Sequence, residues 1–177
     1  MATLISGSTG VNKITDGTIT NADINASAAI AGTKLVMPTG SVLQVVQATS
    51  TTQNTTTSTS FVAASLNASI TPIATNSKIL VTVAGGAMDY ATAAQIYIHL
   101  YRSIGGGNYS DIRDLVRTSI GSPTWSLSHS YNYLDSPNTT SAVSYKPYYK
   151  TSDASKGMLF NNSFAVPITM TLMEIAG

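Results

Sequence analysis

Cysteine is absent from this chain of 177 residues. Its absence excludes disulfide bonds, thiol catalysis and zinc sites built on cysteine. A protein that works outside a cell without disulfides has to gain its stability in another way. Association of subunits is the usual substitute, because binding between folded chains stabilises the folded state.

Charged residues are scarce, at 10% of the chain, compared with about 25% in an average soluble domain. The formal net charge is +1 and no basic stripe is visible, which argues against a nucleic-acid partner. No apolar run approaches the roughly 18 residues of a membrane span, so we expect no membrane insertion. The surface must be built from Ser, Thr, Asn, Gln and Tyr, which is more typical of extracellular and virion surface proteins than of cytosolic enzymes.

Aromatic residues are missing from the first 60 positions, and the first of them is Phe61. Aromatic rings supply much of the buried area of a core, so we expect residues 1–40 to build no core of their own. The turn-like sequence from Met37 to Gly40 marks a boundary. We therefore predict an N-terminal attachment and trimerisation segment in residues 1–40 and a folded head in residues 41–177.

Aliphatic residues recur every five or six positions in the N-terminal segment. This spacing fits neither a strand nor a helix. It favours an extended, turn-rich chain whose apolar side chains are covered by other chains. A helix of two or three turns from Ile24 to Ala31 is the alternative, although that length is marginal in isolation. The predicted assembly residues are Ile14, Ile19, Ile24, Ile30 and Leu35.

From Ser41 onward, apolar residues alternate with a period of two, which is typical of half-buried antiparallel strands. In "SKILVTVAGGAM", Ile79, Val81 and Val83 share one face. In "QIYIHLYRS", the face of Ile96, Ile98 and Leu100 lies opposite that of Tyr97, His99 and Tyr101. In the last run, Ile168, Met170, Leu172 and Glu174 lie opposite Thr169, Thr171 and Met173.

Turn signals separate these runs, among them "NSK", "AGG", "GGGN", "GSP", "DSPN" and "SDASKG". Together they predict a mainly β fold, an antiparallel β-sandwich of jelly-roll type. Two segments remain open. The Thr-rich stretch from Thr49 to Ser60 fits a loop or an edge strand. The spacing of Asp114 and Arg117 fits a single helical turn or a charged strand edge.

The stretch "ITDGTITNADINASAAIAGTKL" resembles a segment found across structural proteins of tailed bacteriophages, especially fibres of marine phages. The downstream stretches "GSVLQVVQAT", "TSTSFVAASLNASITP", "NSKILVTV", "YLDSPNTTSAVSYK" and "ITMTLMEIAG" are similar to C-terminal domains of phage fibres. The resemblance covers most of the chain through the order of its pieces. It implies a virion protein, usually a homotrimer, with an N-terminal attachment region and a β-sandwich head.

Residues of catalytic type give little sign of a reaction. The two histidines, His99 and His129, are thirty positions apart. We interpret His99 as a polar residue in an aromatic sheet face or subunit interface; a metal ligand on a threefold axis is the alternative. Asp111 and Asp114, beside Arg113 and Arg117, favour a surface ion-pair cluster. The glycines of "GGGN" predict a hairpin tip and not a phosphate loop. We expect no enzyme and no catalytic, cofactor-binding or metal-binding residue.

Aromatic residues crowd the second half of the chain. Tyr and Trp offer a stacking face and a polar group, which suits carbohydrate or protein partners. Packing in the core or between subunits is the alternative role for most of them. The candidate ligand-facing residues are Trp125, Tyr131, Tyr133, Tyr145, Tyr148 and Tyr149.

These observations favour a structural virion protein, a trimeric phage fibre or decoration on the particle surface that contacts capsid, tail or adaptor proteins. The alternative is an adhesin at a tail-fibre tip that recognises a host surface glycan or protein. A polysaccharide-degrading tailspike is a weaker third hypothesis, because it would need a long parallel β-helix and paired carboxylates.

Overall fold

The computed structural model describes residues 35–90, 94–119, 126–155, 157–160 and 166–177. Contacts divide the chain into a unit of residues Met1–Val36 and a unit of residues Met37–Gly177. Leu35 and Val36 are the described residues of the first unit, and both are exposed. The other predicted assembly residues lie outside the described residues, as does the alternative helix: Ile14, Ile19, Ile24 and Ile30.

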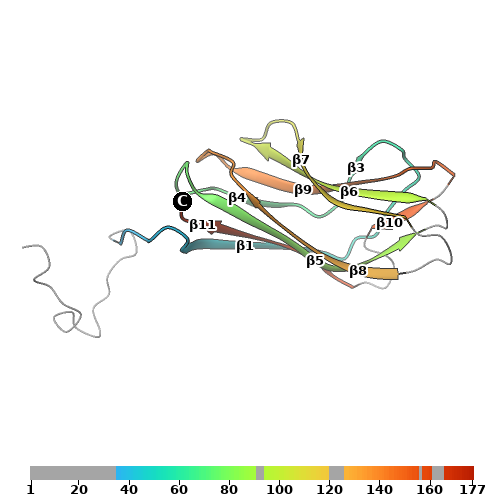
Figure 1. The fold of residues 1–177 in the computed structure, drawn as a ribbon, viewed down its shortest axis with the longest axis horizontal. Coiled ribbons are helices and arrows are strands. Elements are labelled where there is room, and N and C mark those ends of the chain that lie inside the picture. The colour runs from blue at the N-terminus through green and yellow to red at the C-terminus, as the bar shows by residue number, and fades with distance from the viewer. Residues whose placement is uncertain (1–34, 91–93, 120–125, 156, 161–165) are drawn as a thin grey trace, which may run out of the picture. The chain divides into compact units, whose positions relative to one another are not determined.

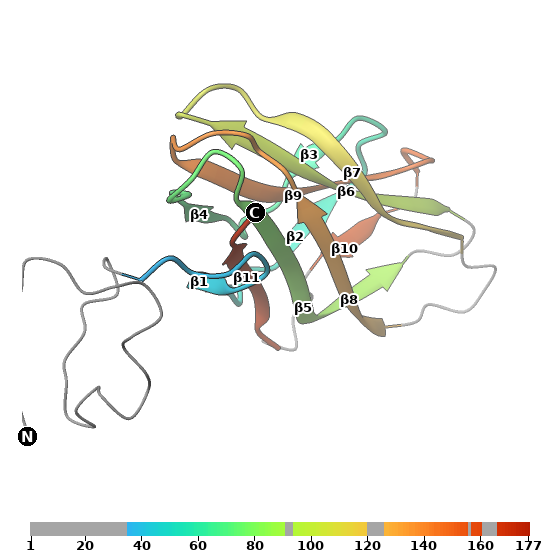
Figure 2. The same ribbon diagram turned by 60° about the vertical axis from the view of Figure 1, so that its left-hand side comes forward.

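The second unit is built from antiparallel strands in two layers, which Figures 1 and 2 show from two sides. Sheet A runs in the order β1 (Val42–Ser50), β11 (Ile168–Ile175), β5 (Lys78–Tyr90) and β8 (Ser126–Asp135), and the short strands β10 (Met158–Phe160) and β2 (Asn54–Thr56) extend it beside the end of β5. In sheet B, β3 (Val62–Ala63) and β4 (Ala68–Ile70) both pair with β9 (Val143–Thr151), which is followed by β6 (Gln95–Ile104) and β7 (Ser110–Ser119).

Eight of the strands form nested antiparallel pairs. β1 pairs with β11, β4 with β9, β5 with β8, and β6 with β7. The two resulting sheets have the orders β1-β11-β5-β8 and β4-β9-β6-β7. This nesting of antiparallel pairs across two sheets is the double Greek key of a jelly roll. The predicted antiparallel β-sandwich of jelly-roll type is therefore confirmed. No helix in the described part of the chain is long and apolar enough to span a bilayer.

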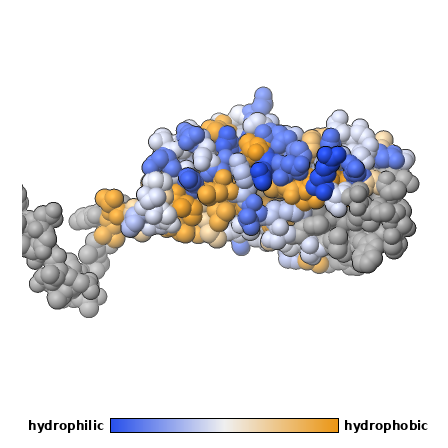
Figure 3. All heavy atoms as spheres, viewed as in Figure 1, coloured by the Kyte–Doolittle hydropathy of each residue, from blue (hydrophilic) through white to orange (hydrophobic). Residues whose placement is uncertain are grey.

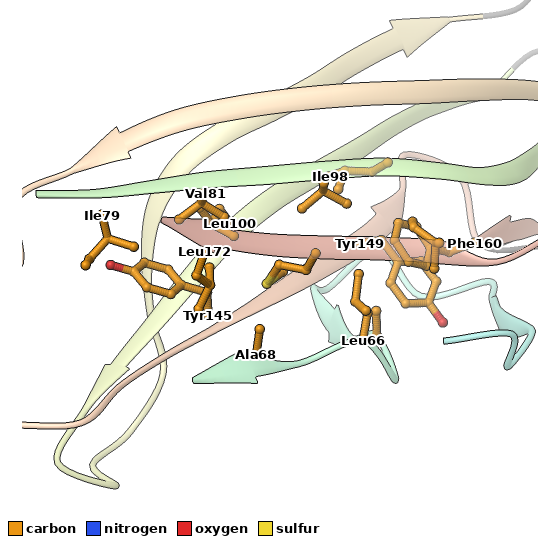
Figure 4. Packing of buried hydrophobic residues seen from close by; sticks show 14 of the residues in the cluster. Leu66, Ala68, Ile79, Val81, Ile98, Leu100, Tyr145, Tyr149, Phe160 and Leu172 are labelled. Carbon is orange, nitrogen blue, oxygen red and sulfur yellow. The ribbon is translucent and has the colours of Figure 1, made fainter. Parts of the chain in front are cut away.

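The core lies between the two sheets and follows the predicted alternation. Both sheets contribute inward-facing side chains that are at most a few per cent exposed. Figure 4 shows these side chains meeting in one layer, with the rings of Tyr149 and Phe160 stacked at one end. The central members are Ile79, Val81 and Val83 of β5, Ile96, Ile98 and Leu100 of β6, and Ile168, Met170 and Leu172 of β11.

The sequence "AGG" was expected to form a turn, and this prediction is wrong. Gly85 and Gly86 lie inside β5, at a bulge in its pairing with β8. Gly85 has a φ of +86°, and a Cβ there would lie 2.6 Å from the carbonyl oxygen of Pro167. Glycine accepts both constraints. On one side of β5, the neighbouring strand is β11 before the bulge and β10 after it. The glycines therefore bend the strand and do not end it.

The Thr-rich segment combines both of its predicted forms. Its first two residues, Thr49 and Ser50, end β1, and Asn54–Thr56 forms the short edge strand β2 on β10. The residues between these strands and up to Ser60 are assigned to neither. The predicted hairpin tip at "GGGN" is confirmed, because Gly105 and Gly106 adopt positive φ in the turn that joins β6 to β7.

A buried polar cluster joins the two sheets. The carboxylate of Asp135 at the end of β8 is 4% exposed. Arg102 Nη1 on β6 donates to both of its oxygens at 2.9 Å, and the hydroxyl of Tyr145 on β9 donates to Oδ2 at 2.7 Å. Burial raises the pKa of the Tyr145 hydroxyl, and its hydrogen bond to Asp135 raises it further. Tyr145 therefore stays protonated and remains a donor.

Glu174 on β11 anchors the loop that carries the chain from sheet B to sheet A. Its carboxylate is fully buried. It accepts hydrogen bonds from Gln44 Nε2 at 2.5 Å and from the backbone N–H of Ile73 at 2.7 Å. Burial raises the pKa of this carboxyl group, but the hydrogen bonds from Gln44, Ile73 and Ala74 lower it, and the net pKa lies below its ordinary value of 4.5.

Replacing Asp135 tests the cluster between the sheets. Asp135→Ala leaves Arg102 and Tyr145 with unpaired donors, and loss of one partner of a buried pair typically costs about 3–5 kcal/mol. We expect Asp135→Ala to lower the free energy of unfolding in urea by about that amount. Asp114→Ala is the matched control, because its side chain is 53% exposed, and it should cost under about 1 kcal/mol. Equal effects of the two substitutions would contradict this account of the cluster.

Glu174 predicts a dependence of stability on pH. A carboxyl group with a lowered folded pKa stabilises the fold above its unfolded pKa, and this contribution disappears as the pH falls through the folded pKa. We expect Glu174→Gln to be about 1–3 kcal/mol less stable than the parent at pH 7, because a neutral amide accepts these hydrogen bonds less well. The measurement is urea unfolding of both proteins at a series of pH values from neutral to acid.

The difference between the two proteins should shrink once the pH falls below 4.5, the ordinary pKa of the group. Comparing the pair cancels the other carboxyl groups that titrate in the same range. A difference that stays constant from neutral to acid pH would show that the ionised form of Glu174 is not what anchors the loop.

Candidate ligand-binding face

The outer face of sheet B carries rings and cations in place of the small polar residues found elsewhere on the surface. On β6 the outward residues are Tyr97, His99 and Tyr101, as the sequence predicted from their alternation with buried residues. On β9 they are Lys146, Tyr148 and Lys150, which are paired with Tyr101, His99 and Tyr97 respectively. Each outward residue of β6 therefore has a lysine or a tyrosine beside it on β9.

The neighbouring strand β7 adds charged groups to the same face. Two register shifts in the pairing of β6 with β7 place Asp111 opposite Tyr101 and Asp114 opposite His99, while Arg117 lies opposite Tyr97. The three charged residues thus share a face although they are three positions apart. The spacing of Asp114 and Arg117 comes from bulges in an edge strand. The alternative of a single helical turn is wrong, and the charged strand edge is confirmed.

Rings on this face contact one another directly. Tyr101 and Tyr148 stack with their centroids 3.9 Å apart and an angle of 22° between planes. Phe61, just before β3, lies over His99 with a centroid distance of 4.3 Å and is also 5.9 Å from Tyr101. Tyr109, from the hairpin between β6 and β7, lies 6.1 Å from Tyr148. We call this set the aromatic face: Phe61, Tyr97, His99, Tyr101, Tyr109 and Tyr148.

Three cations on sheet B, Lys146, Lys150 and Arg117, lie over rings of the aromatic face. Lys150 Nζ lies 4.7 Å from the Phe61 ring centroid and 4.9 Å from that of Tyr97. Lys146 Nζ lies 5.1 Å from the Tyr109 centroid, and the Arg117 guanidinium lies 5.3 Å from that of Tyr97. Ion pairs recorded for the described residues involve neither these lysines nor Arg117. A cation held over a ring keeps its charge available to an anion.

The two carboxylates of this face are engaged by histidine. Asp111 Oδ2 lies 2.6 Å from His99 Nδ1, and Asp114 Oδ1 lies 3.6 Å from His99 Nε2. The predicted ion-pair cluster with the arginines is therefore wrong. The register shifts turn Arg113 toward the Tyr133 ring, where its guanidinium lies 5.6 Å from the centroid. Burial, with the nearby Asp111 charge, raises the pKa of Tyr101.

The arrangement suits binding more than catalysis. It offers flat rings, two ammonium groups and a guanidinium, with the carboxylates confined to the β7 side. Among the described residues there is no group of three His, Asp or Glu side chains placed to hold a metal ion. Stacking of rings and attraction of anions are the chemistry that such a face provides.

The six predicted ligand-facing aromatic residues are scattered by the structure. Tyr148 alone among the described ones lies on the aromatic face. Tyr145 and Tyr149 are 0% and 3% exposed and belong to the core, so burial removes them from any surface site. Tyr131 and Tyr133 pack against the core from β8. Trp125 lies outside the described residues.

The sequence held a signal that separates these tyrosines. In β9, "VSYKPYYK", every second residue is buried. The lysines Lys146 and Lys150 mark the outward parity, which Tyr148 shares and which Tyr145 and Tyr149 do not. Phe61 and Tyr109 lie outside the long strands, so no alternation could have placed them on this face.

Comparisons with known proteins found no matching family model and no matching curated protein. Among solved structures, similar chains occur in a structure of the Gt strain of infectious bursal disease virus, with 15% identity and a TM-score of 0.46 over 85% of this chain. A mutant VP2 protein of that virus, in derived particles, has 15% identity and a TM-score of 0.39 over 84% of this chain. The match spans only 42% and 41% of those longer chains.

Proposed function

We propose that this chain is a structural protein of a virion, a homotrimeric fibre or decoration of a tailed phage. Residues 1–40 attach it to the particle, and the jelly-roll head projects from the surface. The resemblance of "ITDGTITNADINASAAIAGTKL" and of the head strands to phage fibre segments supports this role. The observation that carries the proposal is an apolar row on the outer face of sheet A.

The apolar row crosses all four long strands of sheet A. Pairing places Val45 beside Met173, Met173 beside Leu80, and Leu80 beside Leu134. Val45 is 56% exposed and Leu134 is 48% exposed. Val42, 50% exposed, and Ile175 form a second pair near the start of β1. A contiguous apolar stripe on a sheet face supports a contact surface at this place.

Apart from Lys78, which is paired with Ile175 at the edge of this row, the rest of this outer face is neutral. The next row contains Gln47, Thr171, Thr82 and Asn132, and the one after it contains Thr49, Thr169, Ala84 and Ser130. In a cyclic oligomer, residues at the axis meet their own copies. A charged face would therefore repel itself, whereas this one can meet a second and a third copy.

The two outer faces of the head thus differ in chemistry. Figure 3 shows the head from the side, with hydrophilic residues along its upper part and hydrophobic residues below them, toward the end where β1 begins. We assign sheet A to contacts between copies and sheet B to the outside of the assembly. The N-terminal residues Ile14, Ile19, Ile24, Ile30 and Leu35 supply the remaining contacts, with the other copies or with capsid, tail or adaptor proteins.

A receptor-binding adhesin is the second candidate, and the aromatic face favours it. The outer face of sheet B carries half-buried rings with cations over them. The outer face of sheet A carries hydroxyl and amide groups in the corresponding rows, so the rings of sheet B are unusual for this protein. Host surface glycan and protein are both ligands that aromatic side chains suit. The two candidates are compatible, since a fibre that projects from a particle can also bind.

The proposed trimer can be tested through the apolar row. We expect the full chain to behave in light scattering as a particle of three times 18.4 kDa. Leu134→Arg places a charge in the row and should raise the concentration at which the assembly dissociates by at least about tenfold, because each buried uncompensated charge costs over 1.4 kcal/mol. Gln53→Arg is the matched control, since Gln53 is exposed beyond the far end of β1.

A full chain that stays at 18.4 kDa at every concentration would overturn the proposed trimer. A trimer that Leu134→Arg and Gln53→Arg leave equally intact would place the contact somewhere other than the apolar row.

A further inference from the structure

We propose that the aromatic face binds an acidic polysaccharide, a chain of sugars that carry carboxylate groups, laid along β9. This inference deepens the adhesin candidate and rests on it. It assigns the ligand class and the residues that bind it, with Tyr148 and its stacking partner Tyr101 as the platform and Lys146 and Lys150 as the anion-binding groups.

The platform comes from the stacked pair at the centre of the face. Tyr101 and Tyr148 lie nearly parallel at 3.9 Å, and both are partly exposed. The apolar C–H face of a sugar ring packs against such an aromatic ring, while its hydroxyl groups remain solvated or bonded to neighbours. Beyond this platform the hydroxyls of Ser69 and Ser144 form an exposed pair 2.6 Å apart.

The preference for an acidic sugar comes from charge. Lys146 and Lys150 flank Tyr148 on the same outward face of β9, four residues apart, which corresponds to about 13 Å at the rise of a strand. Neither ammonium group has a carboxylate partner among the ion pairs of the described residues. Both lie over rings, which hold them near the surface without neutralising them.

The carboxylates of the face do not cancel this charge, because they lie on the far side of β6. Asp111 and Asp114 both face His99, and β6 separates them from β9. The face is therefore positive along β9 and acidic along the part of β7 that carries Asp111 and Asp114. An extended polymer with repeated carboxylates fits the positive strip. The aspartates on β7 repel it, so the bound chain should lie parallel to β9.

A neutral glycan or a protein fits these observations less well. A neutral sugar would use the stacked rings but gain nothing from the two lysines. A protein partner of the usual size would have to cover β7 as well as β9, and its contact would bury the two aspartates. The strip of Lys146, Tyr148 and Lys150 is narrow and linear, as is a polysaccharide chain.

The test measures binding of the full-length assembled protein to a panel of acidic and neutral microbial polysaccharides, followed by titration with galacturonate oligosaccharides and with galactose oligosaccharides as the neutral match. We expect the acidic members to bind and the affinity to fall as salt is raised, because screening weakens contacts between exposed charges. Binding of neutral members alone, or of no member of the panel, would overturn the proposal.

Variants assign the binding to the named residues. Lys150→Met keeps the length of the side chain and removes the charge, and it should lower the affinity for the acidic ligand about fivefold or more. Arg113→Met is the control, because it removes a charge from β7 that lies over the Tyr133 ring and outside the aromatic face, and it should leave the affinity unchanged. Tyr148→Ala should lower the affinity about tenfold, and Tyr148→Phe, which keeps the ring, should restore it. Equal affinities for Lys150→Met and Arg113→Met would also overturn the proposal.

Light scattering on the same samples separates this proposal from the fibre proposal. The substitutions lie on sheet B, away from the apolar row, so each variant should keep the assembly state of the parent. An assembled trimer that binds no polysaccharide would contradict the ligand assignment but would not contradict the fibre proposal.

Discussion

Burial of one face of every long strand against the opposite sheet is the constraint on which the rest of this structure depends. A jelly roll of two sheets has a single shared core, and each strand can place only alternate residues in it. The strands β5, β6, β9 and β11 obey this rule with few exceptions. The residues between the buried ones face solvent or partners. The two outer faces carry different kinds of residue, apolar and neutral side chains on sheet A and rings with cations on sheet B.

Buried polar groups fix how the two sheets meet. Asp135 on sheet A binds Arg102 and Tyr145 on sheet B, while Glu174 on sheet A holds the crossing loop at Ile73. Hydrophobic burial is non-directional, so it specifies the alignment of the two sheets less sharply than hydrogen bonds do. A buried carboxylate is costly unless it accepts hydrogen bonds, so these two contacts favour one alignment of the two sheets. That alignment in turn fixes which side chains of β6 and β9 lie outward together.

The alternation of apolar residues, with turn signals between the runs, predicted the fold, because alternation comes from the geometry of a strand and needs no knowledge of its neighbours. Ile79, Ile98 and Met170 are buried as their spacing indicated. The prediction failed where the conformation or orientation of a residue depends on a neighbouring strand. The bulge at Gly85 depends on the carbonyl of Pro167, and the outward position of Asp114 depends on shifts in its pairing with β6.

The candidate site was predicted less well for the same reason. Counting aromatic residues grouped Tyr145, Tyr148 and Tyr149 together, although adjacent residues of a strand lie on opposite faces. The parity of the lysines in β9 was visible in the sequence. Phe61 was not predictable, since it reaches the aromatic face from the end of a loop and contacts a strand that lies 38 positions later (99 − 61).

The central claim is that the outer face of sheet A forms contacts between copies and that the outer face of sheet B binds a ligand. Hydroxyl-radical footprinting of the full chain, above and below the concentration at which it assembles, tests that claim directly. Assembly should protect Met173 and Leu134 on sheet A from oxidation and leave Tyr148 and Tyr109 on sheet B as reactive as before. Protection of the tyrosines with no change at Met173 would contradict the account, because the copies would then meet through the aromatic face.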